Sequence, residues 1–281
     1  MRKEIIIVSF SGGRTSAYMS WWLKEYMSWL YNFIFVYANT GLEYEETLEF
    51  IDQCDKHFKL NLIWLEAVVN RKKGSGTEHK IVDFTSASRN GEPMEEVIKK
   101  YGLPNMTYIH CTRETKLQVI QSYKNSLDLN NSRNAVGIRY DEFHRVKNNP
   151  SIIYPLATIT QITKQEILDF WKTMPFDLQI EEHQGNCKGC YKKSDKKLKM
   201  IADESPEDFD FWVRMENKYS NILSPKEIEQ RVIYRGYRTA YEVQNNINLP
   251  ENLTEIDECP EECGVIPGDY IPTEAQNVLF I

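Results

Sequence analysis

The stretch IIIVSFSGGRTS, residues Ile5–Ser16, decides the fold. Ile5–Ser9 is a short apolar run rich in β-branched residues, which predicts a strand covered on both faces. Gly12 and Gly13 follow in a turn, and Ser16–Met27 then carries helix-forming and aromatic residues. A strand that passes through a glycine turn directly into a helix is typical of the first unit of an α/β protein.

The same alternation continues along the first half of the chain. Further strands are predicted at Phe33–Ala38, Leu62–Val68 and Ala135–Ile138, with helical segments at Thr47–Phe58 and around Val119–Tyr123. Short strands separated by helix-length segments imply a parallel sheet with right-handed crossovers. We therefore expect a Rossmann-like α/β fold: a doubly wound parallel sheet of about five strands flanked by helices.

Beyond Pro155 the pattern becomes helical. Helices are predicted at Thr163–Lys172, Ser194–Glu204 and Pro206–Tyr219, with another beginning at Ser224 and an irregular tail from Asn246. Thr163 and Glu166 have the spacing of a capping box. Arg71–Glu92 is polar and glycine-bearing, which predicts a long loop or lid. We expect an α/β domain at residues 1–185 and a cysteine-containing helical C-terminal region at residues 186–281.

Composition and charge narrow the class of protein. Hydrophobic residues make up 41% and charged residues 27% of the 281 residues, as in ordinary globular proteins. The formal charge of −7 makes the whole chain a poor non-specific binder of nucleic acid. The apolar run in Met1–Phe10 is too short for a signal peptide, and no stretch approaches the roughly 18 apolar residues of a membrane span. We expect a cytoplasmic homo-oligomer that does not contact a membrane.

The glycine loop suits an anionic ligand. Glycines let the backbone approach a phosphate closely, and the amides at a helix start point at it. Arg14 supplies charge, and hydroxyl donors come from Ser9, Ser11, Thr15 and Ser16. The loop lacks the Lys-Ser/Thr ending of a Walker A loop and is not G-x-G-x-x-G. A turn without any ligand is the alternative, but open α/β sheets bind ligands at this end of the first strand.

Three further segments follow the glycine loop along the chain: NTGLE at Asn39–Glu43, VGIRYDE at Val136–Glu142 and YPL at Tyr154–Leu156. They resemble the "D/N-T-G", "G-x-R-x-x-E" and "Pro-Leu/Ile" segments of the ATP pyrophosphatase superfamily, whose PP-loop the glycine loop also resembles. Within that superfamily the chain is similar to the phosphoadenosine phosphosulfate (PAPS) reductase branch over roughly Ile5–Met200. Thr15 stands where many PP-loops carry aspartate.

The resemblance implies an adenine nucleotide alpha hydrolase-like fold that binds ATP or PAPS together with Mg²⁺. The pyrophosphate end of ATP, or the sulfate-phosphate end of an adenylyl sulfate, would occupy the loop, with the base near Ala38–Gly41. Arg139 would bind phosphate or sulfate as a catalytic residue; a surface ion pair with Asp141 or Glu142 is the alternative. The implied nucleotide-binding residues are Ser9, Ser11, Gly12, Gly13, Arg14, Thr15, Ser16, Asn39, Thr40, Gly41 and Gly137.

The cysteines suggest metal or redox chemistry. Cys187 and Cys190 form a C-x-x-C, which can hold a metal ion or cluster edge or form a redox disulfide. Cys111 lies in a segment, His110–Lys116, that resembles a cysteine-plus-basic stretch of the family. One hypothesis is an iron–sulfur cluster or Zn²⁺ bound by Cys111, Cys187, Cys190 and a fourth ligand, either Cys259, Cys263 or His110. The alternative is a buried Cys111 and two free thiols, with Cys54 a bystander.

Glu262-Cys263-Gly264 resembles the start of the "E-C-G-L-H" segment of PAPS reductases, although Val265 and Ile266 replace Leu-His. In that family the cysteine attacks sulfur, and a second thiol resolves the S-sulfocysteine. Cys263 is therefore a candidate nucleophile. Cys259 and Cys263 could equally be metal ligands, and the surrounding carboxylates would raise the pKa of the Cys263 thiol, which opposes thiolate formation.

Two basic stretches raise the question of a nucleic-acid partner. A lysine run comprises Lys188, Lys192, Lys193, Lys196, Lys197 and Lys199, and a second set interleaves Arg231, Arg235 and Arg238 with Tyr234, Tyr237 and Tyr241. The first could guide a polyanion, and the second resembles a stacking surface. The alternatives are a solvated helix face balanced by local acids and tyrosines packed in a core.

Three functions stay open. In the first, the enzyme cleaves the α–β bond of ATP, leaves AMP on an acceptor oxygen, and so activates that carbon for sulfur or nitrogen delivery. In the second, it reduces an adenylyl sulfate through Cys263 with a thiol reductant. In the third, a nucleotide-sensing or nucleic-acid-associated module binds ATP without turnover.

Overall fold

A six-stranded sheet forms the centre of the computed structural model, which describes residues 3–72, 75–222 and 230–248. The strands are β1 (Glu4–Phe10), β2 (Tyr31–Asn39), β3 (Ile63–Val69), β4 (Thr77–Val82), β5 (Arg133–Ala135) and β6 (Ile152–Ile153). Their order is β4-β3-β2-β1-β5-β6, and every neighbouring pair is parallel except β3 and β4. The predicted α/β, Rossmann-like fold is confirmed.

Strand β4 corrects the prediction of a long loop at Arg71–Glu92. Thr77 pairs with Val69 and Val82 with Trp64, in an antiparallel register. The strand lies at the edge of the sheet and is mostly exposed. An edge strand needs few apolar residues, so its polar sequence, TEHKIV, reads as a loop. The strand predicted at Ala135–Ile138 is also wrong in its bounds, because β5 ends at Ala135.

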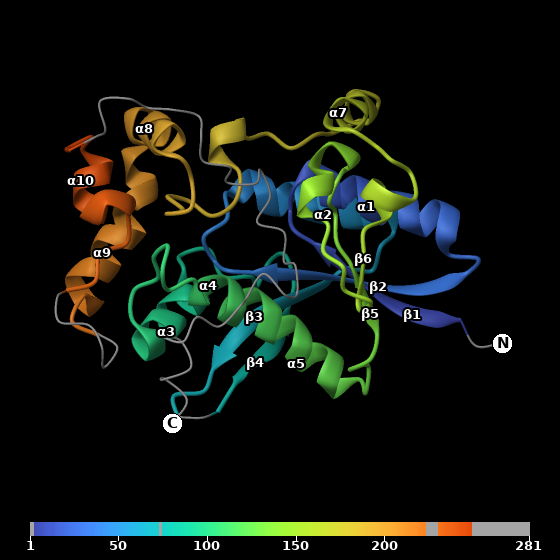
Figure 1. Cartoon of the computed structure of the whole chain (residues 1–281), viewed down its shortest axis with the longest axis horizontal. Coiled ribbons are helices and arrows are strands. Elements are labelled where there is room, and N and C mark those ends of the chain that lie inside the picture. The colour runs from blue at the N-terminus through green and yellow to red at the C-terminus, as the bar shows by residue number, and fades with distance from the viewer. Residues whose placement is uncertain (1–2, 73–74, 223–229, 249–281) are drawn as a thin grey trace.

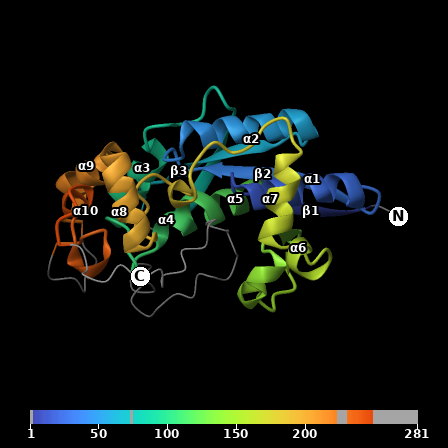
Figure 2. The same cartoon turned by 90° about the horizontal axis from the view of Figure 1, so that it is seen from above.

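Helices cover both faces of the sheet (Figures 1 and 2). On one face lie α1 (Arg14–Met27), α2 (Glu45–Phe58) and α7 (Lys164–Lys172); on the other lie α3 (Glu92–Tyr101), α4 (His110–Thr112) and α5 (Gln118–Ser126). Ile6 and Val8 pack against the first set and Ile7 against the second. Because alternate side chains of β1 are buried on opposite faces, the strand is a continuous apolar run.

The remaining elements are mostly short turns and helices after β5. Helix α6 spans Pro155–Thr158, and the C-terminal region contains α8 (Asp195–Glu204), α9 (Asp210–Tyr219) and α10 (Ala240–Gln244). The capping box of α7 is confirmed, since Glu166 accepts from both the amide and the hydroxyl of Thr163. The helix predicted from Ser224 lies outside the described residues. Among the residues described, no helix combines the length and apolar character needed to cross a lipid bilayer.

A second apolar core joins α3 to α8, α9 and α10. It contains Leu42, Met94, Ile98 and Leu103 together with Tyr191, Leu198, Ile201, Phe209, Trp212, Met215, Ile233, Tyr234 and Val243. Residues from both sides of the expected domain boundary after residue 185 therefore share one core. The division at that boundary stays a prediction.

Glu216 of α9 gives this second core a pH dependence. Its carboxyl group is buried and accepts from the amides of Ile233 (3.0 Å) and Ala240 (2.5 Å). Burial raises the pKa of Glu216 from 4.5 to about 7. The native carboxyl group therefore keeps its proton to a higher pH than the unfolded one does, and the native state loses stability as the pH rises from 4.5 through 7.

We expect the titration of Glu216 to lower the free energy of unfolding by roughly 2 kcal/mol as the pH rises from 5 to 8. Urea unfolding of the wild type and of Glu216→Gln across that range measures the difference. The wild type should lose more stability than the variant as the pH rises. Parallel pH profiles of the two proteins would contradict this assignment.

Candidate functional site

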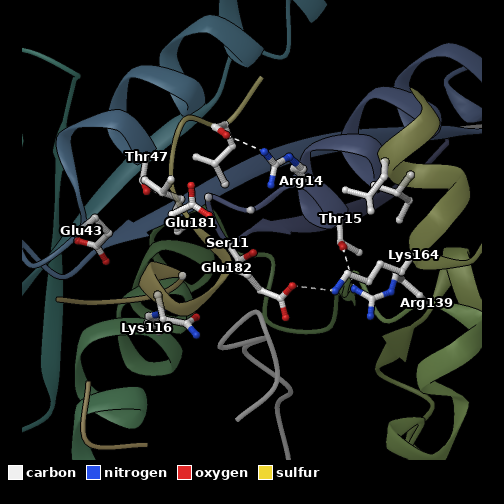
Figure 3. A pocket seen from close by; sticks show the side chains of 18 residues that line it. Ser11, Arg14, Thr15, Glu43, Thr47, Lys116, Arg139, Lys164, Glu181 and Glu182 are labelled. Carbon is white, nitrogen blue, oxygen red and sulfur yellow. Dashed lines mark hydrogen bonds and ion pairs between the residues drawn. The ribbon is translucent and has the colours of Figure 1, made fainter. Parts of the chain in front are cut away.

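A cavity of about 170 Å³ opens at the carboxyl ends of the central strands (Figure 3). Its floor is the phosphate loop, which we define as Ser11–Thr15; it runs from the end of β1 into the first turn of α1. The other lining residues are Glu43, Thr47, Lys116, Arg139, Lys164, Ile167, Leu168, Leu178, Ile180, Glu181, Glu182, Gly185 and Asn186. Segments after β1, β2 and β5 meet here, which is where open α/β sheets bind ligands.

The phosphate loop is held by its own backbone and by Ser16. Gly12 has φ +94°, which favours glycine, and a Cβ at this position would lie 3.0 Å from Cγ2 of Thr47. The Oγ of Ser16 accepts from the Ser11 amide (3.0 Å) and donates to the Gly13 carbonyl (3.0 Å). Ser16 is buried, so it shapes the loop from behind and does not line the cavity.

The N-terminus of α1 is the feature of the loop that suits an anion. Gly13 is its N-cap, no side chain caps it, and no acidic residue lies in its first turn. The first amides of a helix have no intrahelical acceptors, and the helix dipole places partial positive charge at this end. Backbone N–H groups here suit a phosphate or sulfate.

Besides Arg14 of the phosphate loop, three cationic side chains reach the cavity from separate segments: Lys116, Arg139 and Lys164. Arg139 is 6% exposed; its Nη1 donates to Thr15 Oγ1 (3.3 Å), and its Nε lies 3.1 Å from Asp141. Arg139 therefore lines the cavity and also forms an ion pair with Asp141. Both of the environments predicted for this side chain occur together. Lys164 pairs with Glu182 across the opening at 3.3 Å (Figure 3).

Lys116 depends on an unusual helical turn. Residues Arg113–Leu117 form a π-helical turn between α4 and α5. Such turns insert an extra residue into a helix and occur frequently at functional sites, because they change the direction of a side chain. Lys116 lines the cavity from this turn.

Arg14 differs from its expected role as a source of charge for phosphate. Its guanidinium binds both carboxylate oxygens of Asp177, at 2.7 and 3.0 Å, and the Leu178 carbonyl at 2.6 Å. The carboxylate occupies the bidentate face that a phosphate would need. Arg14 therefore anchors Asp177 and Leu178 beside the phosphate loop.

The predicted residues after β2 support the cavity without lining it. Asn39 Nδ2 donates to Glu66 Oε1 (2.6 Å), and its Oδ1 accepts from the Gly41 amide (3.2 Å). Thr40 Oγ1 donates to Glu43 Oε1 (2.9 Å). Together these contacts fix the turn from which Glu43 faces the cavity.

Two other predicted nucleotide-binding residues also lie behind the cavity. A Cβ at Gly137 would contact Ser16 Cα at 3.4 Å, so this glycine allows the segment after β5 to pack on α1. Ser9 lies in β1 and does not line the cavity. Direct contact with a nucleotide stays a prediction for the loop residues and Arg139.

The cysteines near the site pack against the second core. Cys187 Sγ lies 3.3 Å from Thr40 Oγ1 and 4.0 Å from Glu43 Oε1; burial and then the charge of Glu43 raise the pKa of this thiol. Cys111 Sγ lies 3.0 Å from Tyr191 Oη. Cys54 is buried in the apolar core between the sheet and helices α1, α2 and α7.

The predicted metal site is not assembled by the described residues, because no three His, Cys, Asp or Glu side chains there converge as a metal-binding group. Cys111 and Cys187 have protein hydroxyl groups as neighbours instead. Cys259 and the candidate nucleophile Cys263 lie outside the described residues. An iron–sulfur or zinc site that includes them stays a prediction.

The basic stretches are largely engaged within the protein. Lys193 is buried and donates to the Gly185 carbonyl, and Lys199 pairs with Asp203 at 2.5 Å. Arg231, Tyr234 and Arg238 are buried, whereas Tyr237 is 88% exposed and Tyr241 58% exposed. The side chains at these positions therefore divide between core packing and the surface.

The polar and charged lining residues that the sequence did not indicate as binding residues are Glu43, Thr47, Lys116, Lys164, Glu181, Glu182 and Asn186. Lys116 lies in the segment His110–Lys116, and Lys164 follows the predicted cap Thr163, but neither pattern indicates where the lysine side chain points.

Comparison with known proteins agrees with this arrangement. The family model described as "Phosphoadenosine phosphosulfate reductase domain" matches residues 5–154, more than half of the 281 residues. The "Uncharacterized nin region protein ORF290" of Escherichia phage lambda is 35% identical over 243 residues, covering 83% of this chain and 81% of that protein. An uncharacterized protein of Methanocaldococcus jannaschii is 26% identical over 144 residues, covering 51% of this chain and 25% of that protein. The chain therefore belongs to the phosphoadenosine phosphosulfate reductase domain family.

Proposed function

We propose that the cavity binds the phosphates of ATP and that the protein transfers AMP to an acceptor with release of pyrophosphate. The uncapped N-terminus of α1, which opens onto a cavity lined by Lys116, Arg139 and Lys164, carries the proposal. Helix amides and basic side chains together match an anion with several charged oxygens. Transfer to a carbon-bound oxygen would activate that carbon for sulfur or nitrogen delivery.

In this reaction an acceptor oxygen attacks the α-phosphorus, and the bond from that phosphorus to the α–β bridging oxygen breaks. The bridging oxygen leaves with the electron pair as part of pyrophosphate. The phosphate-loop amides and Arg139 would hold the phosphate oxygens in place, while Lys116 and Lys164 balance the charge on the leaving group. Such positioning and charge stabilisation supply much of the catalysis in phosphoryl transfer.

A Mg²⁺ ion at a nucleotide site needs few ligands from the protein, and Glu43 is suited to be one of them. Mg²⁺ in nucleotide sites is commonly bound by one or two carboxylates together with the substrate phosphates. Glu43 lines the cavity and is held by the amides of Thr40 and Leu42 (3.2 and 3.1 Å). When bound, Mg²⁺ would neutralise charge on the pyrophosphate.

Reduction of an adenylyl sulfate is the second candidate, favoured by the description of the matching family. The Cys263 thiolate would attack the sulfur of PAPS and displace adenosine 3′,5′-bisphosphate. A thiol reductant would then attack the cysteine sulfur, form a disulfide and release sulfite. Cys187 does not suit this role, because burial raises the pKa of its thiol and keeps it protonated.

The candidates are separated by binding and product analysis on the full-length protein. Calorimetric titration with ATP, AMP, pyrophosphate and PAPS tests the site, and ATP is expected to bind and to raise the melting temperature. Pyrophosphate and AMP formed from ATP support AMP transfer. Sulfite formed from PAPS and a thiol, and lost in Cys263→Ser, supports reduction. Binding of ATP without product supports a nucleotide-sensing module, and no heat with any of the four compounds would overturn the site itself.

A further inference from the structure

Thr47 has a buried hydroxyl that the protein leaves without a hydrogen bond. The residue is 7% exposed, and Oγ1 has no donor or acceptor partner in the part of the chain that the structure describes. Buried side-chain hydroxyls are nearly always hydrogen-bonded, so an exception needs an explanation. Thr47 lines the cavity, which places the unused hydroxyl beside the anion-binding loop.

The local packing explains how this hydroxyl is oriented. Thr47 is the third residue of α2, and its Cγ2 would lie 3.0 Å from a Cβ on Gly12. The methyl group therefore packs on the loop, and the hydroxyl occupies the other branch of the side chain. Figure 3 shows Thr47 on the opposite side of the phosphate loop from Arg139.

Glu43, a carboxylate that also lines the cavity, is engaged elsewhere. Glu43 accepts from the Thr40 amide, the Thr40 hydroxyl (2.9 Å) and the Leu42 amide (3.1 Å). No hydrogen bond joins Thr47 to it among the described residues. The hydroxyl thus has no hydrogen-bond partner among the described residues.

We propose that Thr47 Oγ1 donates a hydrogen bond to an oxygen of the anion bound on the phosphate loop, on the side opposite Arg139. This inference rests on the proposed function, since it assigns a binding residue to the same site. The anion would then be held from two sides, by Arg139 near Thr15 and by Thr47 near Gly12. A hydroxyl contributes a directional contact here without adding charge.

Two substitutions separate the hydroxyl from the methyl group. Thr47→Val keeps the shape of the side chain and removes the donor, whereas Thr47→Ser keeps the donor and removes the methyl contact with Gly12. Thr173→Val is the control, because Thr173 is exposed and its hydroxyl donates to the Phe170 carbonyl, outside the cavity. Calorimetry with ATP and with inorganic pyrophosphate measures affinity, and thermal melting without ligand measures stability.

Thr47→Val is expected to weaken ATP and pyrophosphate about tenfold, whereas Thr47→Ser and Thr173→Val bind like the wild type. Unliganded Thr47→Val should melt no lower than the wild type, because its hydroxyl has no partner to lose. Wild-type affinity in Thr47→Val would overturn the inference alone. Equal loss in Thr47→Ser and Thr47→Val would also overturn it, in favour of a packing role. A wild type that binds neither compound would overturn the proposed function and this inference together.

Discussion

Replacing Arg139 by alanine is expected to lower kcat for pyrophosphate release from ATP by about 10²–10³. Arg139 is 6% exposed, lines the cavity and donates to Thr15 Oγ1 at 3.3 Å. Its guanidinium can bind two phosphate oxygens in one plane, which a lysine ammonium does not reproduce. Arg139→Lys should therefore also lose activity, although it keeps the charge. Steady-state release of pyrophosphate at saturating ATP measures both effects.

Arg145→Lys is a matched control for this experiment. Arg145 ends the turn Tyr140–Arg145, for which Arg139 is the N-cap, and like Arg139 it pairs with Glu142, but it does not line the cavity. It should retain kcat within about twofold of the wild type, because a partly exposed ion pair contributes little. Equal losses in Arg139→Lys and Arg145→Lys would assign Arg139 to the ion pairs of this turn and remove it from the reaction.

Gly91→Ala is expected to destabilise the protein by about 2–5 kcal/mol. Gly91 has φ +81°, and a Cβ there would lie 2.3 Å from Cε2 of Phe211 and 2.9 Å from Cδ2 of Leu42. The left-handed conformation costs about 1–2 kcal/mol for an L residue, and overpacking typically adds about 1–3 kcal/mol. Urea unfolding measures the loss.

Gly76→Ala provides the comparison, because no heavy atom lies within 4 Å of its Cβ position. This variant should remain within about 0.5 kcal/mol of the wild type. Gly91 also donates from its amide to the Gly41 carbonyl at 2.8 Å, so its displacement would reach the turn that carries Glu43. Wild-type stability of Gly91→Ala would contradict the close packing described here.

The fold was predictable where the signals are local. The strand, glycine turn and helix at Ile5–Met27 follow from neighbouring residues, and the capping box at Thr163 needs only four positions. β4 was not predictable, because an exposed edge strand has little apolar periodicity and its pairing with β3 is tertiary. The end of β5 at Ala135 was not predictable either, because the apolar run continues through Ile138.

Part of the candidate site was likewise predictable from local motifs, and part was not. The loop glycines and Arg139 were identified from motifs, and they line the cavity. Arg14 was placed in the correct loop, but its partner Asp177 lies 163 residues away in the sequence, so its engagement could not be foreseen. Thr47, Lys116 and Lys164 come from three separate helical segments that only the folded chain brings to one cavity.

The core shared by α3 and the C-terminal helices bears on how this chain could be shortened. Cutting after residue 185 would uncover the apolar side chains of Leu42, Met94 and Ile98, which are now at most 3% exposed. Water-exposed patches of this kind favour aggregation. A shortened protein that stays dispersed would need polar replacements on that face of α3. Helices α8, α9 and α10 therefore shield this apolar face of α3 from water.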